Sequence, residues 1–311
     1  MLGSITNAVD TGQRRAHDFS RAIVPSALPA YATVMVMTTF IALSVIFSSF
    51  RYDAGYLNSP ILSLVLIGAT GIVIRLCGHA RAGSGIEAIA VFGAIILAAP
   101  LYAVVLASSN LPLVDETLAR LDRQLFFGFN RTDFAYWVAS HQGLFAATKW
   151  VYHSLMLQPW VLLGLLFTAG VEKRGWQLLF AWGLTLFIVI TISPLTPALG
   201  SPPYFLDFED TFHGARDGSL RIIGREALTG IVTFPSFHAA AAVLLAWGFA
   251  AFRYIGPVLV GLNVLMWLSA IVAGHYLIDL VAGSVIAIVA IAVSRATINR
   301  IETSERRIAE F

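Results

Sequence analysis

The sequence predicts an all-α integral membrane protein with about eight transmembrane helices. Of its 311 residues, 58% are apolar and only 12% are charged, and the mean hydropathy is +0.78. A soluble domain carries about 25% charged residues, so this chain has roughly half the usual share. The apolar residues are also gathered into runs that are long enough to cross a bilayer. Composition and run length together predict the fold class.

Eight apolar runs count as spans, because a spanning helix needs about 20 residues. They occupy residues 29–50, 59–77, 86–108, 143–169, 175–196, 234–252, 256–273 and 276–294. A polar segment with three arginines precedes the first run, and we expect it to be a cytoplasmic lead-in.

Basic residues predict how the chain faces the two sides of the membrane. With the N-terminus inside, the Lys173-Arg174 connection and the arginines of 295–307 fall on the cytoplasmic side, as the positive-inside rule requires. We therefore expect both termini in the cytoplasm and the chain in the plasma (inner) membrane. The net charge is only +2 and the cations are scattered, so we expect membrane lipids and no nucleic acid as partners.

The outer segment 112–141 has helical periodicity. Apolar residues recur at helical spacing up to Leu125, while charged residues such as Asp122 take the other face. This pattern predicts an amphipathic helix that lies on the interface, with a lid or brace as its simplest role. Asn130 is typical of a cap that starts a second helix.

Three ionisable side chains stand at the rims of the last apolar runs. His238 opens the sixth run, within Phe234-Pro-Ser-Phe-His238, and His275 and Asp279 follow the seventh, within Gly274-His-Tyr-Leu-Ile-Asp279. The eight-span count puts both groups on the extracytoplasmic side. Ionisable groups are costly in such places, so they are candidates for function.

The residues before His238 are suited to binding an anion. Pro235 is compatible with a first helical turn, where its missing N–H would have had no partner, and Thr233 could cap that turn. The free N–H groups and the helix dipole would then favour a phosphate. Ser236 adds a hydroxyl donor, and we predict that it binds the phosphate.

His275 and Asp279 are four residues apart, which places them on one face of a helix. The aspartate could accept the Nδ1–H of the imidazole, fix its tautomer and leave Nε2 free as a nucleophile. His238 would then be the general acid that protonates the leaving oxygen. Attack by His275 on phosphorus would give a phosphohistidine, which water or an alcohol resolves.

These two motifs resemble the second and third signature motifs of the type 2 phosphatidic acid phosphatase superfamily. They look closest to its inositol phosphorylceramide synthase-like (inositolphosphotransferase) branch. The resemblance implies a six-helix membrane core at 86–296. Two additional spans and the cytoplasmic lead-in would make up 1–85, and a cytoplasmic tail would follow at 297–311.

The resemblance also implies a mechanism. It makes His275 the nucleophile that becomes phosphorylated, His238 the acid, Asp279 the residue that orients His275, and Ser236 a phosphate contact. Superfamily members are metal-independent, so we expect no metal and no cofactor. The implied substrate is a lipid phosphate.

The sequence departs from the family in its phosphate-binding cations. The usual first motif, a lysine followed by Arg-Pro, is absent, and the Pro-rich stretch 196–204 stands in its place, as in the synthase-like branch. The arginine often found six residues before the third-motif histidine is Ser269 here. Arg221 and Arg225 are our candidates, since Arg binds phosphate in a bidentate manner; ordinary loop arginines are the alternative.

Lys149, Tyr152 and His153 lie within the fourth run, and Lys149 shares a helix face with His153. An intramembrane lysine needs a polar cavity, so these residues are candidates to line the site. A structural or snorkelling role is the alternative.

Three readings of function remain at this point. The first is a lipid phosphate phosphatase or phosphotransferase, with hydrolysis and transfer separated only by the acceptor that reaches the phosphohistidine. The second is a metal-dependent membrane enzyme that uses His238, His275 and Asp279 as ligands. The third is a non-catalytic transporter with a His-Asp proton relay. Inverted internal repeats would favour this alternative, and the sequence shows none.

Overall fold

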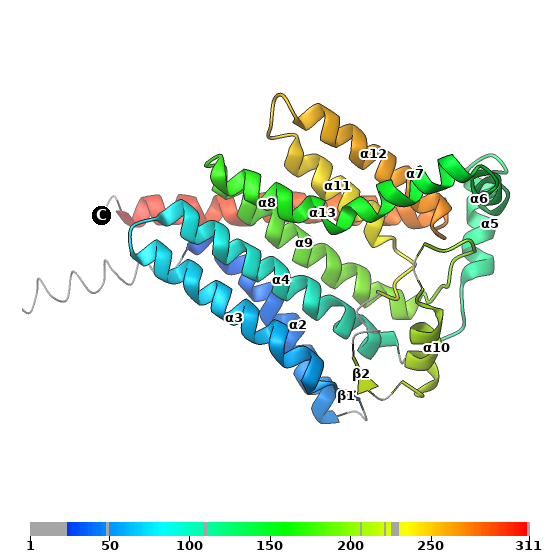
Figure 1. Cartoon of the computed structure of the whole chain (residues 1–311), viewed down its shortest axis with the longest axis horizontal. Helices are drawn as coiled ribbons and strands as arrows, with labels where there is room; N and C mark the ends of the chain where they lie inside the picture. Colours follow the sequence, from blue (N-terminus) through cyan, green and yellow to red (C-terminus); the bar gives the residue numbers. More distant parts are fainter. Residues whose placement is uncertain are drawn as a thin grey trace, which may run out of the picture.

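The computed structural model describes residues 24–47, 50–107, 111–205, 207–220, 222–224 and 230–309. Helices make up 79% of the described residues and strands only four residues, which confirms the all-α membrane fold (Figure 1). Arg221 and Arg225, our candidate phosphate-binding cations, lie outside the described residues.

The longer helices account for all eight apolar runs. They are α2 (Leu28–Phe47), α3 (Ala54–Leu76), α4 (Ala80–Ala107), α7 (Gln142–His153), α8 (Gln158–Thr168), α9 (Glu172–Ile192), α11 (Phe237–Phe249), α12 (Gly256–Val272) and α13 (Leu277–Ala309). Short 3₁₀ turns are η1 (Pro25–Ala27), η2 (Ser154–Met156) and η3 (Ser193–Leu195). The remaining elements are α5 (Asp115–Leu125), α6 (Arg131–Ser140), α10 (Glu209–Asp217) and the paired strands β1 (Arg51–Tyr52) and β2 (Ile222–Ile223).

Five of the described helices are long and apolar enough to cross a membrane, namely those that contain α2, α3, α4, α9 and α13. Helices α7 and α8 meet the same criterion together, but they are bent by 47° at a short break, so they add a sixth span only if they count as one. The other two runs are shorter helices, α11 with 13 residues and α12 with 17. The eight-span count therefore stays a prediction.

Helix α9 lies at the centre of the bundle. It contacts α2 and α4 on one side and α11 and α13 on the other (Figure 1). Most of the apolar side chains of α2 and α3 are exposed on the surface of the protein, as expected of helices that face lipid. The main hydrophobic core lies between α4, α8, α9 and α11.

The α3–α4 hairpin carries a buried ion pair. The Nη2 of Arg75 lies 2.8 Å from the Oε2 of Glu87, and the Tyr31 hydroxyl of α2 donates to the same carboxylate. An apolar helix can hold a charge only where a partner neutralises it, so this pair ties the first three spans together.

Helices α5 and α6 lie at the end of the bundle where α12 ends and α13 begins, on the right in Figure 1. The expected helix of the outer segment is present as α5, and Asn130 caps α6 by accepting hydrogen bonds from the N–H groups of Thr132 and Asp133. A second hydrophobic cluster brings α6, α7, α11 and the end of α12 together at this end. Sequence-distant elements thus converge around the motif residues.

Candidate active site

Ser236 is the cap that precedes helix α11. Its side chain accepts a hydrogen bond from the N–H of Ala239, and the residue is fully buried. The expectation that Thr233 caps the helix and Pro235 opens it was wrong, because the first helical residue is Phe237. Thr233 and Pro235 have the residue types of a cap and a first-turn proline, but Ser236, the residue after the proline, is the cap.

The start of α11 is joined to the start of α13. The N–H of Ser236 donates to the carbonyl of Asp279 at 3.0 Å. A Cβ added at Gly283 would lie 2.1 Å from the carbonyl oxygen of Ser236, so the two helices approach as closely as only glycine permits. This packing fixes the distance between the two motifs.

His275 lies in the turn between α12 and α13, two residues before α13 begins. The prediction that His275 and Asp279 share a helix face was therefore wrong in detail, although it placed them together. The Nδ1 of His275 is 3.5 Å from the Oδ2 of Asp279, which is longer than an ordinary hydrogen bond. The same oxygen accepts the Tyr276 N–H at 2.8 Å, so the carboxylate also closes the first turn of α13.

His238 faces the same region from α11. Its Nδ1 is 3.1 Å from the Tyr152 hydroxyl, and its ring stacks on that of Tyr152 with the centroids 3.8 Å apart. The ring centroids of His238 and His275 are 6.5 Å apart. Tyr152 is buried and packs against one face of the His238 ring.

Two aspartates of α5 hold the segment that carries His275. Asp122 accepts hydrogen bonds from the N–H groups of Leu277 and Ile278 at 2.8 and 2.9 Å, and it is buried. Burial raises the pKa of Asp122, while the two N–H donors act in the opposite direction. Asp122 therefore caps the start of α13 instead of facing water, while Glu116, Arg120 and Arg123 of α5 are exposed, so that α5 braces the segment through its buried aspartate.

Asp115 extends this brace to the Pro-rich loop. Its carboxylate accepts the N–H groups of Leu199 and Gly200 at 3.1 and 2.7 Å, and the Tyr276 hydroxyl lies 3.4 Å away. Gly200 has φ +81°, and a Cβ there would lie 2.3 Å from the carbonyl oxygen of Gly274. The loop that replaces the usual first motif is thus packed directly against the residue before His275.

Arg131 lies near the candidate site, and the sequence did not predict it there. It is buried at the start of α6, and among the described residues it donates to the main-chain carbonyls of Ile271, Val272, Ser201 and Pro202. Burial lowers its pKa to about 10, against the opposing effect of nearby tyrosines and Asp279. The Asn-Arg-Thr-Asp pattern in which Arg131 stands indicates the start of a helix, but it does not indicate that the arginine side chain is buried.

A family model described as the PAP2 superfamily matches residues 116–293, more than half of the chain. The chain belongs to the PAP2 superfamily. Members are phosphoesterases, which supports a phosphatase-type enzyme for lipid phosphates in general. No curated protein and no solved structure matches the chain.

The PAP2 match extends from α5 into α13 and leaves α2 to α4 outside. It includes both sequence motifs and the residues that hold them, Tyr152, Asp122 and Arg131. The elements that assemble around the two histidines are therefore those of the family region.

The structure brings together His238, His275, Asp279 and Tyr152, and His153 lies beside Tyr152 on α7. The His153 ring is 5.6 Å from that of Tyr152 and 6.5 Å from that of Phe205 in the Pro-rich loop. His153 is half-buried, whereas Lys149, one turn earlier, is exposed. Among the described residues, no three His, Cys, Asp or Glu side chains form a group that could hold a metal ion.

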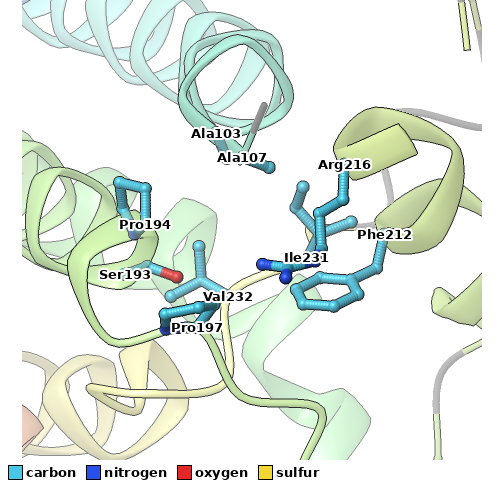
Figure 2. A pocket seen from close by; sticks show the side chains of 9 residues that line it. All are labelled: Ala103, Ala107, Ser193, Pro194, Pro197, Phe212, Arg216, Ile231 and Val232. Carbon is cyan, nitrogen blue, oxygen red and sulfur yellow. The ribbon is translucent and has the colours of Figure 1, made fainter. Parts of the chain in front are cut away.

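A small cavity lies between α4, η3 and α10 (Figure 2). Its volume is about 10 Å³, which is room for about one water molecule. The guanidinium of Arg216 points into it, and its Nη2 donates to the carbonyl of Leu111. None of the motif residues lines this cavity, so it belongs to the packing of α10 rather than to the active site.

Proposed function

We propose that this PAP2 superfamily protein is a membrane lipid phosphate phosphatase or phosphotransferase that works through a phosphohistidine on His275. The observation that carries the proposal is the arrangement of His275 between the buried Asp279 carboxylate and the His238 ring. An imidazole oriented by a carboxylate on one nitrogen has its other nitrogen available for attack.

The proposed reaction has two steps. In the first, Nε2 of His275 attacks phosphorus, the bond from phosphorus to the lipid oxygen breaks, and His238 gives that oxygen a proton. In the second, the resulting base His238 takes a proton from water or an acceptor alcohol, whose oxygen attacks phosphorus and releases His275. Hydrolysis and transfer share the first step and differ only in the acceptor.

Phosphate binding is assigned in the same proposal to Ser236, Arg221 and Arg225, with Lys149 and His153 along the approach. The Ser236 hydroxyl accepts from the N–H of Ala239, and in this proposal its own proton is donated to a phosphate oxygen. The arginines would supply bidentate contacts to an anionic group.

We favour head-group transfer of the inositol phosphorylceramide synthase type, because stretch 196–204 resembles the Pro-rich version of the first motif in that branch. Its packing against Gly274 and Tyr276 places the divergent segment beside the nucleophile. In this proposal, the loop that differs from the common family pattern selects the acceptor.

The test uses purified full-length protein in lipid nanodiscs. We expect diacylglycerol release from phosphatidic acid or phosphatidylinositol, with inositol phosphorylceramide formed when short-chain ceramide is added, and full activity after exhaustive EDTA treatment. Release of diacylglycerol without formation of inositol phosphorylceramide would support a phosphatase and contradict the transferase. Loss of activity with EDTA and its return with a divalent cation would contradict the metal-independent mechanism.

We also propose that the site faces the extracytoplasmic side of the plasma (inner) membrane, with both termini in the cytoplasm. The support is the positive-inside distribution, to which the exposed Lys173 at the α8–α9 connection contributes. A green fluorescent reporter fused at the C-terminus should fluoresce, while alkaline phosphatase fused there should be inactive. The opposite pair of results would reverse the orientation.

A further inference from the structure

We propose that Arg131 is a positioning residue: it holds the turn that carries the nucleophile His275 and so fixes the position of the imidazole. The inference rests on the proposed function of His275. It concerns a residue outside both motifs, at the start of the helix that Asn130 caps.

The contacts of Arg131 join three segments. The Nε donates to the carbonyl of Ile271 at 2.6 Å and the Nη2 to that of Val272 at 3.0 Å, so the guanidinium covers the last turn of α12. The Nη1 donates to the carbonyls of Ser201 and Pro202. One side chain thereby fixes α12 and the Pro-rich loop to the start of α6.

The same loop returns to the turn that holds His275. The N–H of Ser201 donates to the carbonyl of Gly274 at 3.1 Å, and the Ser201 hydroxyl is 3.0 Å from that of Thr132. The turn therefore has α12 before it and the loop beside it, and Arg131 binds both. Its hold on His275 is completed on the other side by Asp122, which caps α13.

Burial makes these bonds strong and their loss costly. Arg131 is 3% exposed, so removing the side chain would leave four carbonyls without this donor. A guanidinium has five N–H donors in a fixed planar fork, whereas an ammonium has three on a flexible stem. Lysine would keep the charge but could not bridge the three segments in the same geometry.

The first test compares Arg131→Ala and Arg131→Lys with Arg123→Ala, a control in which an exposed arginine of α5 is removed. A small displacement of a nucleophile can cost about 10²-fold in rate, so both Arg131 variants should lose about that factor in kcat with KM unchanged. Guanidinium chloride, far below denaturing concentrations, should restore part of kcat in Arg131→Ala, and urea should not. Wild-type kcat in folded Arg131→Ala, or a loss that guanidinium does not relieve, would overturn the inference.

The second test does not need a substrate. Carbethoxylation of His275 by diethyl pyrocarbonate, measured by mass spectrometry, should be about tenfold faster in Arg131→Ala because the turn opens locally. The exposed His213 should react equally in both proteins. Equal rates at His275 would overturn the inference. If Arg131→Ala does not fold, Arg131→Lys decides by the same two readouts.

The two tests separate the inference from the proposed function. A wild-type protein that is inert on every lipid phosphate would remove the proposed function, and the modification rates would still decide whether Arg131 holds His275. An active wild type with an equally active, folded Arg131→Ala would remove the inference alone.

Discussion

Replacing His275 with alanine is expected to abolish turnover and acid-labile ³²P labelling together. The imidazole is the only group in the proposed scheme that forms a bond to phosphorus, so no covalent intermediate can form without it. Removal of a nucleophile in a hydrolase that acts through a covalent intermediate costs on the order of 10⁶-fold in kcat. In the variant, Asp279 has no imidazole to orient, and His238 has no leaving group to protonate because no attack on phosphorus takes place.

The measurement is a quench of enzyme with ³²P-labelled phosphatidic acid, followed by denaturing electrophoresis at neutral and at acid pH. His213→Ala is the matched control, since His213 is exposed on α10 and should label as wild type. Label that persists in His275→Ala would remove His275 as the nucleophile. Thermal melting of both variants shows whether the effect is chemical.

Replacing His238 with alanine is expected to slow the enzyme most for poor leaving groups. A general acid contributes about 10² to 10⁴ in rate, and its contribution falls when the leaving oxygen is already a stable anion. The lipid alkoxide of phosphatidic acid needs a proton, whereas p-nitrophenolate does not. The variant should therefore lose about 10² to 10⁴ in kcat on the lipid and far less on the aryl phosphate.

The comparison uses both substrates with the same two proteins, and His213→Ala again serves as the control. Equal losses on the two substrates would contradict the acid role. The effect should appear in phosphoenzyme formation, because the proton is given when the lipid leaves. Pre-steady-state labelling separates that step from later attack by water or alcohol.

The sequence predicted which groups could carry out the chemistry, but not the way in which the chain holds them. His238, His275 and Asp279 could be found because ionisable residues are rare in apolar runs and their spacing has a chemical meaning. The cap at Asn130 and the helix in 112–141 followed from local patterns. All of these signals act over a few residues.

Arg131 and Asp122 could not be found in the same way. Both lie in a segment whose periodicity indicates an amphipathic helix, and a polar face looks the same whether it meets water or main-chain groups. Their partners are carbonyls and N–H groups, which every residue has, so the sequence carries no matching signal. The displaced start of α13 has the same origin, because Asp122 and Asp279 decide where that helix begins.

The length of α11 has a consequence for how a lipid reaches the site. Thirteen residues of helix extend about 20 Å, while the hydrocarbon of a bilayer is about 30 Å thick. If α11 ends at the cytoplasmic interface, its histidine end lies well below the opposite head groups. A substrate would then bring its phosphate down between the helices while its tails stay among other tails, and the lipid product would never have to leave the bilayer. The access route would need to admit a charged head group from the side.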